Sequence, residues 1–401
     1  MMRMGIPAFD WLSSLWHNHL SRPKEETLPV SQHPNPRCAY LIAIAHQVLG
    51  RIVEPDLRAA FLFGSVAWGD ADAASDIDIM LLLDRPAGYR EVTRVRVADL
   101  LGYAPADGPR FVDLDRFSVD TFNEVTHTGG WGQRVVHSII LKDMDSYFER
   151  IRKQVTASYF EPAARVERFR RLQAQAEAHR AAMRAELDID ETLAALYARL
   201  ALEAAAGALL ELDDARLSLT HFVESVRQAL FNIGHGDLYS LFLHALAVDA
   251  GPESVDTSLQ AYRVFADALK GWMAAPDVAG RLSTEDQAWA AFTYGAETYE
   301  EIDHKVTTFG QLQRLPALLY YLDGLLYVPI RINLGKILLL RSSGAVGRIS
   351  IPDFHVALRA EPRLFETWVS ALRLGSPCQQ ALNADELTAH LLDIGEVDAR
   401  N

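Results

Sequence analysis

The chain has 401 residues, of which 49% are hydrophobic, so it is long enough to fill two or three hydrophobic cores. Its formal net charge of −14 argues against a surface that binds nucleic acid throughout. Its two cysteines, Cys38 and Cys378, match no disulfide framework or zinc motif, which favours a globular protein of a reducing compartment.

Two apolar stretches raise the question of membrane insertion. The first, near the N-terminus, contains Asp10 and lacks a convincing cleavage site of small residues, so we predict no secretion signal. The second, at 319–340, is interrupted by Asp323, Arg331 and Lys336, and falls short of the roughly 20 apolar residues that span a bilayer. We expect a buried helix pair there, a cytoplasmic protein and no membrane partner.

The first part of the chain mixes strand and helix patterns. Proline and charged residues at 22–37 indicate an extended N-terminal arm over 1–34. Together the patterns that follow predict an α+β domain with a short mixed sheet over 35–145. The elements expected in it are a helix at 38–52, a strand at 58–63, a short turn or helix, a strand at 75–84, a helix at 89–101 and a strand at 110–118.

The remainder is expected to be mainly helical, because Ala, Leu, Glu and Arg dominate and apolar residues recur at helical spacing. A break that reads DAGPES lies at 249–254 and is our candidate boundary. We therefore predict a helical domain over 146–250 and a C-terminal helical subdomain over 251–401.

Two aspartates stand in an otherwise apolar predicted strand. Side chains alternate between the two faces of a strand, so Asp76 and Asp78 point the same way while Ile77 and Ile79 face a core. Neighbouring carboxylates repel each other unless solvent or a cation compensates them. Oxygen ligands of this kind suit Mg²⁺, which completes its coordination with water and substrate phosphates. The pair therefore predicts a magnesium site.

A Gly-Ser pair closes the preceding strand. Gly64 lets the backbone approach a ligand, and the Ser65 hydroxyl and nearby amides can bind phosphate oxygens. Next to a magnesium site, such a turn indicates a nucleoside triphosphate.

At this point the chain resembles the nucleotidyltransferase superfamily of the DNA polymerase beta type. Its pattern is an apolar residue and Gly-Ser, then about a dozen residues, then Asp-apolar-Asp. The chain reads FGS at 63–65 and SDID at 75–78. The GSVAWG that begins at Gly64 is similar to the motif of antibiotic-modifying and minimal members. The resemblance implies a Mg²⁺-dependent transfer of a nucleoside monophosphate, with ATP favoured as donor.

The family also has a third acid on a later strand. The strand pattern RFVDLDRFS places that match on Asp113, with Asp115 in reserve. The resemblance thus implies catalytic and metal-binding roles for Asp76, Asp78 and Asp113, and nucleotide binding by Gly64 and Ser65. The proton acceptor for the attacking hydroxyl stays open between Asp113 and a helical-part glutamate, for which Glu203 and Glu211 are candidates.

The acceptor is harder to predict. Antibiotic-modifying relatives suggest a small molecule similar to an aminoglycoside or lincosamide, and the acidic charge balance is compatible with a cationic one. Modification of tRNA or protein, as in toxin–antitoxin relatives, is the alternative, and the basic segment 150–184 is its support. We expect that segment to be a solvated helix face. A non-catalytic regulatory module is a third hypothesis, and a homodimer is left open.

Overall fold

A computed structural model of the protein describes residues 35–127, 131–215, 218, 220–249, 251–280, 294–331, 358–373 and 376–400. The chain divides into two units, Met1–Pro34 and Asn35–Asn401, and every described residue lies in the second. The arm predicted at 1–34 is outside the described residues.

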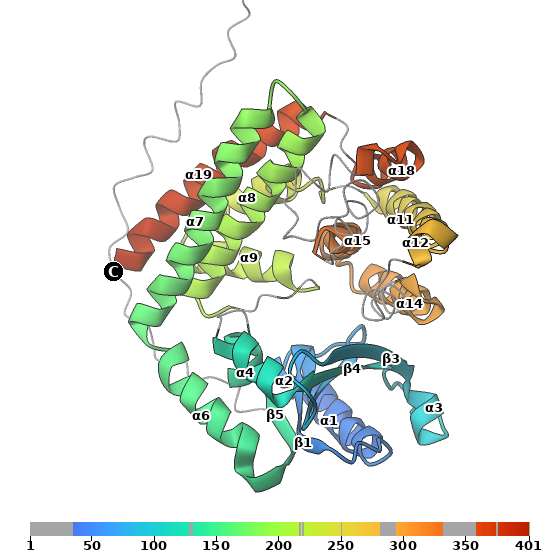
Figure 1. Cartoon of the computed structure of the whole chain (residues 1–401). Helices are drawn as coiled ribbons and strands as arrows, with labels where there is room; N and C mark the ends of the chain where they lie inside the picture. Colours follow the sequence, from blue (N-terminus) through green and yellow to red (C-terminus); the bar gives the residue numbers. More distant parts are fainter. Residues whose placement is uncertain are drawn as a thin grey trace, which may run out of the picture. The chain divides into compact units, whose positions relative to one another are not determined.

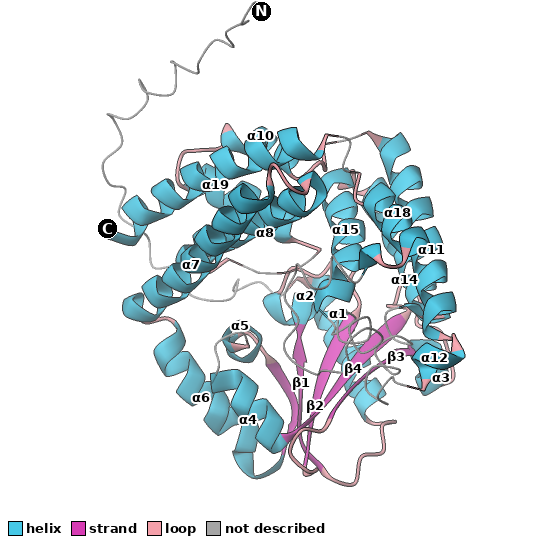
Figure 2. Ribbon diagram, turned by 45° about the horizontal axis from the view of Figure 1, so that its top comes forward, coloured by secondary structure: helices cyan, strands magenta, loops and turns pink. Residues whose placement is uncertain are grey.

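A five-stranded mixed sheet organises the N-terminal part of the second unit (Figure 2). The strands lie in the order β3-β4-β2-β1-β5, with β2 and β4 parallel and the other neighbours antiparallel. This is the short mixed sheet expected from the sequence, and it places the two aspartate-bearing strands side by side. The strands are β1 (Leu57–Phe63), β2 (Ile77–Leu83), β3 (Arg90–Arg96), β4 (Phe111–Ser118) and β5 (Ile139–Asp143).

Helices cover both faces of this sheet, because alternate residues of each strand present apolar side chains to opposite sides. One face packs against α1 (Pro36–Leu49) and α3 (Val97–Leu101). The other carries Phe61, Met80 and Phe117, and packs against α4 (Val119–His127), α5 (Gly132–Val136) and α6 (Tyr147–Tyr159). The aspartates of β2 and β4 point to this second side.

The helix predicted at 89–101 is wrong over its first half. Arg90–Arg96 forms strand β3, which pairs with β4, and only Val97–Leu101 is helical. The strand reads REVTRVR, whose β-branched residues Val92, Thr93 and Val95 favour an extended strand. The correction matters for the site, because it places Arg94 directly opposite Asp113.

The rest of the described chain is helical, as predicted, apart from a short turn of 3-10 helix at Met144–Ser146. Helix α8 packs between α7 and α19 and is almost entirely buried (Figure 1). The helices are α7 (Pro162–Glu186), α8 (Glu191–Leu212), α9 (Phe222–Asn232), α10 (Leu238–Ala245), α11 (Pro252–Met273), α12 (Pro276–Ala279), α14 (Ala296–Gln311), α15 (Leu315–Arg331), α18 (Pro362–Ala371) and α19 (Pro377–Arg400).

Among the described residues, α8 is the one helix long and apolar enough to cross a membrane by length and composition. However, 89% of its most apolar window is buried inside the protein, where it forms the core of the helical part. The apolar run at 319–340 is described only as far as Arg331, within α15; the remainder of the predicted helix pair lies outside the described residues.

The basic segment 150–184 differs from the expected solvated face at two positions. Arg168 and Arg180 on α7 are buried. Arg168 Nε donates to Glu211 on α8 at 2.6 Å, and Arg180 Nε donates to Asp385 on α19 at 2.7 Å. Buried guanidinium groups need such partners, so these arginines join helices.

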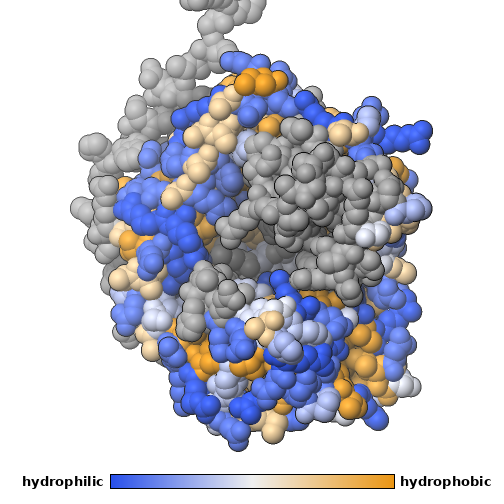
Figure 3. Space-filling view, in the orientation of Figure 1, coloured by the Kyte–Doolittle hydropathy of each residue, from blue (hydrophilic) through white to orange (hydrophobic). Residues whose placement is uncertain are grey.

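Hydrophilic residues cover most of the described surface on the face drawn in Figure 3.

Candidate active site

Three carboxylates meet where the parallel strands β2 and β4 lie side by side. Asp78 on β2 is directly opposite Asp113 on β4, and Asp76 comes two residues before Asp78. Asp76 immediately precedes β2, and the spacing of two directs its carboxylate and that of Asp78 to the same side of the sheet. One carboxylate oxygen from each of the three residues lies within 4.8 Å of the others. We call Asp76, Asp78 and Asp113 the acidic triad.

The turn after β1 approaches this triad closely. Phe63 is opposite Asp78, and α2 (Gly64–Trp68) begins at the next residue. Gly64 has a φ of +69°, and a Cβ atom there would lie 1.9 Å from Asp78 Oδ2. Glycine is therefore required both by the left-handed backbone and by the lack of space. Ser65 follows in the first turn of α2 and is buried.

The triad fits a divalent cation. Burial, together with the charges of Asp76 and Asp113, raises the pKa of Asp78 well above its ordinary value. A positive ion at this point would relieve that repulsion. Three carboxylate oxygens within reach of one centre form a hard, oxygen-only ligand set, which divalent ions such as Mg²⁺ prefer.

A lysine from the helical part contacts the triad. Lys305 on α14 donates from Nζ to Asp76 Oδ2 at 3.2 Å, and its Nζ is 3.0 Å from Glu301 Oε1, one helical turn earlier. The Lys305 and Glu301 residues are 6% and 2% exposed. Although burial alone would raise the pKa of Asp76, the charges of Lys305 and Arg94 lower it below its ordinary value. Asp76 is thus held as a carboxylate.

An arginine from the edge strand β3 binds the third acid. Arg94 Nε and Nη2 donate to the two oxygens of Asp113 at 2.7 and 2.6 Å, in the two-bond geometry that guanidinium and carboxylate favour. Arg94 Nη1 also donates to Thr298 on α14 at 3.4 Å. Two triad members therefore accept hydrogen bonds from protein cations, whereas none of the described basic side chains bonds Asp78.

Asp115, the reserve candidate for the third acid, lies on the same face of β4 but further from the other acids. Its neighbour on β2 is Met80, whereas the neighbour of Asp113 is Asp78. Burial raises the pKa of Asp115 to about 6, although the positive charges of Arg134 and Arg90 oppose the shift. The geometry brings Asp113, and not Asp115, into the acidic triad.

Sequence reasoning missed Arg94, Lys305 and Glu301. Once β3 is recognised as a strand that pairs with β4, the register places Arg94 opposite Asp113. For Lys305 and Glu301 the available signal is weak: a Glu-Lys pair at a spacing of four on a helix is usually exposed. The two glutamates suggested as proton acceptors, Glu203 and Glu211, are instead bound by Arg199 and Arg168.

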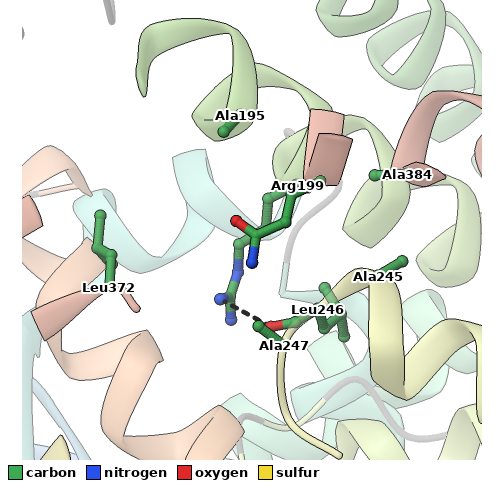
Figure 4. A pocket seen from close by; sticks show the side chains of 8 residues that line it. Ala195, Arg199, Ala245, Leu246, Ala247, Leu372 and Ala384 are labelled. Carbon is green, nitrogen blue, oxygen red and sulfur yellow. Dashed lines mark hydrogen bonds between the residues drawn. The ribbon is translucent and has the colours of Figure 1, made fainter. Parts of the chain in front are cut away.

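The helical part also contains a small pocket, shown in Figure 4. Its charged lining residue, Arg199, donates to Asp323 at 2.7 Å and to the Leu246 carbonyl oxygen at 3.5 Å. Its other lining residues are mostly alanine and leucine. Because Arg199 already binds a buried carboxylate, we assign no ligand to this pocket.

A mixed sheet in which a Gly-Ser turn faces two acids at the start of one strand, with a third acid on the parallel neighbour, defines a nucleotidyltransferase domain. Comparison with family models agrees, since residues 52–129 match the family described as "Polymerase beta, Nucleotidyltransferase". This segment of the chain belongs to the DNA polymerase beta nucleotidyltransferase superfamily, as its motifs predicted.

Among solved structures, a nucleotidyltransferase-like protein from Exiguobacterium sibiricum 255-15 aligns over 79% of this chain and 96% of its own, with 11% sequence identity and a TM-score of 0.30. A likeness at that score carries no weight for fold or function. No curated protein matches the chain. The family assignment therefore depends on residues 52–129 and on the geometry of the site.

Proposed function

We propose that the protein is an enzyme that transfers a nucleoside monophosphate from a nucleoside triphosphate, with ATP as the expected donor, to a hydroxyl group of a small-molecule acceptor. The observation that carries the proposal is the convergence of the Gly64 turn with Asp76, Asp78 and Asp113 in a domain of the matching superfamily.

Each part of the site has a role in this proposal. Asp76, Asp78 and Asp113 would hold Mg²⁺, which supplies positive charge to the attacking and leaving oxygens of an in-line phosphoryl transfer. Gly64 leaves room for the triphosphate, since any side chain at that position would collide with Asp78. The amide and hydroxyl groups of Ser65 would donate to phosphate oxygens.

Two further observations support a small acceptor over RNA. Binding an RNA backbone takes several free basic side chains. In the basic segment, however, Arg168 and Arg180 are buried in ion pairs, and the more exposed Arg170 and Arg184 bind Glu396 and Asp385. The site itself is rich in acids, which suits a cationic acceptor.

The experiment is incubation of the purified chain with each α-labelled nucleoside triphosphate and Mg²⁺. The acceptors are panels of aminoglycosides and lincosamides, bulk tRNA and cell protein. We expect Mg²⁺-dependent labelling of a small molecule, and no labelling by an Asp78→Asn variant. Labelling of tRNA or protein alone would overturn the choice of acceptor. Equal labelling by wild type and Asp78→Asn would overturn the site.

One observation favours the second candidate, a non-catalytic regulatory module. Asp76 and Asp113 are already neutralised by Lys305 and Arg94, as they would be in a domain that has lost its metal. Calorimetric titration with Mg²⁺ and ATP distinguishes the two candidates. A catalytic domain binds ATP more tightly with Mg²⁺ than without it, whereas a degenerate one shows no such difference and labels no acceptor.

A further inference from the structure

Helix α14 presents a buried polar face to the catalytic sheet. Thr298, Glu301, Lys305 and Thr308 recur at spacings of three and four, so they share one side of the helix, and all four are buried. Helices usually bury apolar stripes and leave such residues in solvent. A polar stripe that is buried needs partners, and the catalytic domain supplies them for Thr298 and Lys305.

Contacts between α14 and the catalytic domain run along the helix. Thr298 accepts from Arg94, Glu300 forms an ion pair with Arg96, and Lys305 binds Asp76. Figure 1 shows α14 above β3 and β4. The helix thus reaches the acidic triad through Lys305 and is held to β3 nearer its N-terminus by Thr298 and Glu300.

The Lys305 ammonium bonds an oxygen that a divalent cation would also need. A cation held by all three triad members requires an oxygen of Asp76, and Oδ2 is 3.2 Å from Lys305 Nζ. A divalent ion on the same carboxylate would be repelled by the ammonium at short range, with little solvent to screen it. Glu301, 3.0 Å from Nζ, offers the ammonium another buried partner.

We propose that Lys305 is a positioning residue that stands in for a cation at Asp76 and is displaced toward Glu301 when a divalent ion binds. The inference rests on the proposed function, because it assumes that the triad binds metal. Binding at the triad and docking of α14 are then coupled. By linkage, the ion weakens the contact between Lys305 and Asp76 by the same factor as that contact weakens the binding of the ion.

The test compares Mg²⁺ affinity by calorimetry, without nucleotide, in wild type and Lys305→Met. Loss of a hydrogen bond to a charged group changes an equilibrium by about tenfold or more, so we expect Mg²⁺ to bind Lys305→Met at least about tenfold more tightly. Lys153→Met is the matched control, because the Lys153 side chain is 76% exposed on α6. The Mg²⁺ affinity of this variant should equal that of wild type. The double variant Lys305→Met/Glu301→Gln serves if the single variant fails to fold, because it also removes the buried charge of Glu301, which would otherwise lose its partner.

A second measurement distinguishes displacement of Lys305 by the ion from the simple loss of a positive charge near the acidic triad. Hydrogen exchange of the α14 peptide should become faster in wild type when Mg²⁺ is added, and should not respond to Mg²⁺ in Lys305→Met. Tighter binding by Lys305→Met without any response of α14 in wild type would overturn the displacement.

The outcomes also separate this inference from the proposed function. Equal Mg²⁺ affinity in wild type and both Lys305 variants would overturn the inference and leave the magnesium site standing. If neither wild type nor the variants bind Mg²⁺, the inference and the proposed function are both overturned.

Discussion

Asp76 and Asp78 should respond to the same substitution with opposite changes in stability. Asp76→Asn and Asp78→Asn each replace a carboxylate by a neutral group of equal size. Asp76 accepts a hydrogen bond from buried Lys305, whereas Asp78 faces two other acids without a bonded cation among the described residues. Both variants should lose nucleotide transfer, because each removes charge from the acidic triad.

The expected magnitudes follow from the distances. Two like charges 4.8 Å apart repel by about 3.5 kcal/mol at an effective dielectric constant of about 20, and attraction to Lys305 offsets part of this for Asp78. We therefore expect Asp78→Asn to raise the free energy of unfolding by about 1–3 kcal/mol in metal-free protein. Asp76→Asn should lower it by about 1–3 kcal/mol, because a buried ammonium loses a charged partner.

The pH dependence gives the same contrast. The pKa of Asp78 is raised in the folded protein, so the ionised Asp78 carboxylate lowers the free energy of unfolding. This destabilisation is absent below pH 3.8 and grows as the pH rises toward the folded-state pKa. The gain from Asp78→Asn should therefore be larger at pH 8 than at pH 5. The pKa of Asp76 is lowered, so the stability that it contributes is lost only as the pH falls below 3.8.

Urea unfolding in EDTA at pH 5 and pH 8 measures both effects, and transfer assays with Mg²⁺ measure activity. The reasoning is refuted if the two variants shift stability in the same direction, or if the gain from Asp78→Asn is the same at both pH values.

Three further predictions concern the rest of the site and the acceptor. Gly64→Ala should abolish triphosphate binding in calorimetry, because its Cβ would collide with a triad carboxylate. Gly69→Ala is the control: it has φ +82° and no atom within 4 Å of its Cβ, so it should cost only about 1–2 kcal/mol of backbone strain. Equal triphosphate binding by the two variants would contradict this. Turnover measurements should show Asp113→Ala to be far more damaging than Asp115→Ala, and the reverse order would move the third acid to Asp115. Arg184→Glu should leave transfer to a small molecule within twofold of wild type, and loss of a salt-sensitive RNA labelling in that variant would contradict the choice of acceptor.

The sequence predicts those residues of the site that lie close together along the chain. Gly64, Asp76 and Asp78 lie within one hairpin, so strand periodicity and the spacing of the motif are enough to place them on facing positions. Asp113 lies on a later strand, and the resemblance to the superfamily supplied its assignment as the third acid. The assignment of catalytic roles to these residues stays a prediction.

The helix error at 89–101 came from a segment that changes structure midway. The five residues Val97–Leu101 are helical, whereas Arg90–Arg96, of which four of seven residues are charged, shows no clear period of two. A single strand at the edge of a sheet gains its stability from cross-strand pairs such as Arg94 with Asp113, which a local pattern does not show.

Lys305 could not be predicted, because its partner is 229 positions away and a lysine on a helix is ordinarily solvated. The same contact explains how the chain tolerates its acidic cluster before a divalent ion binds. Asp76 is compensated by Lys305 and Asp113 by Arg94, while Asp78 lowers its cost by taking up a proton more readily. A divalent ion must replace these contributions to bind. The affinity of the triad for such an ion, as proposed above, would therefore depend on α14, distant in the sequence, as well as on the three acids.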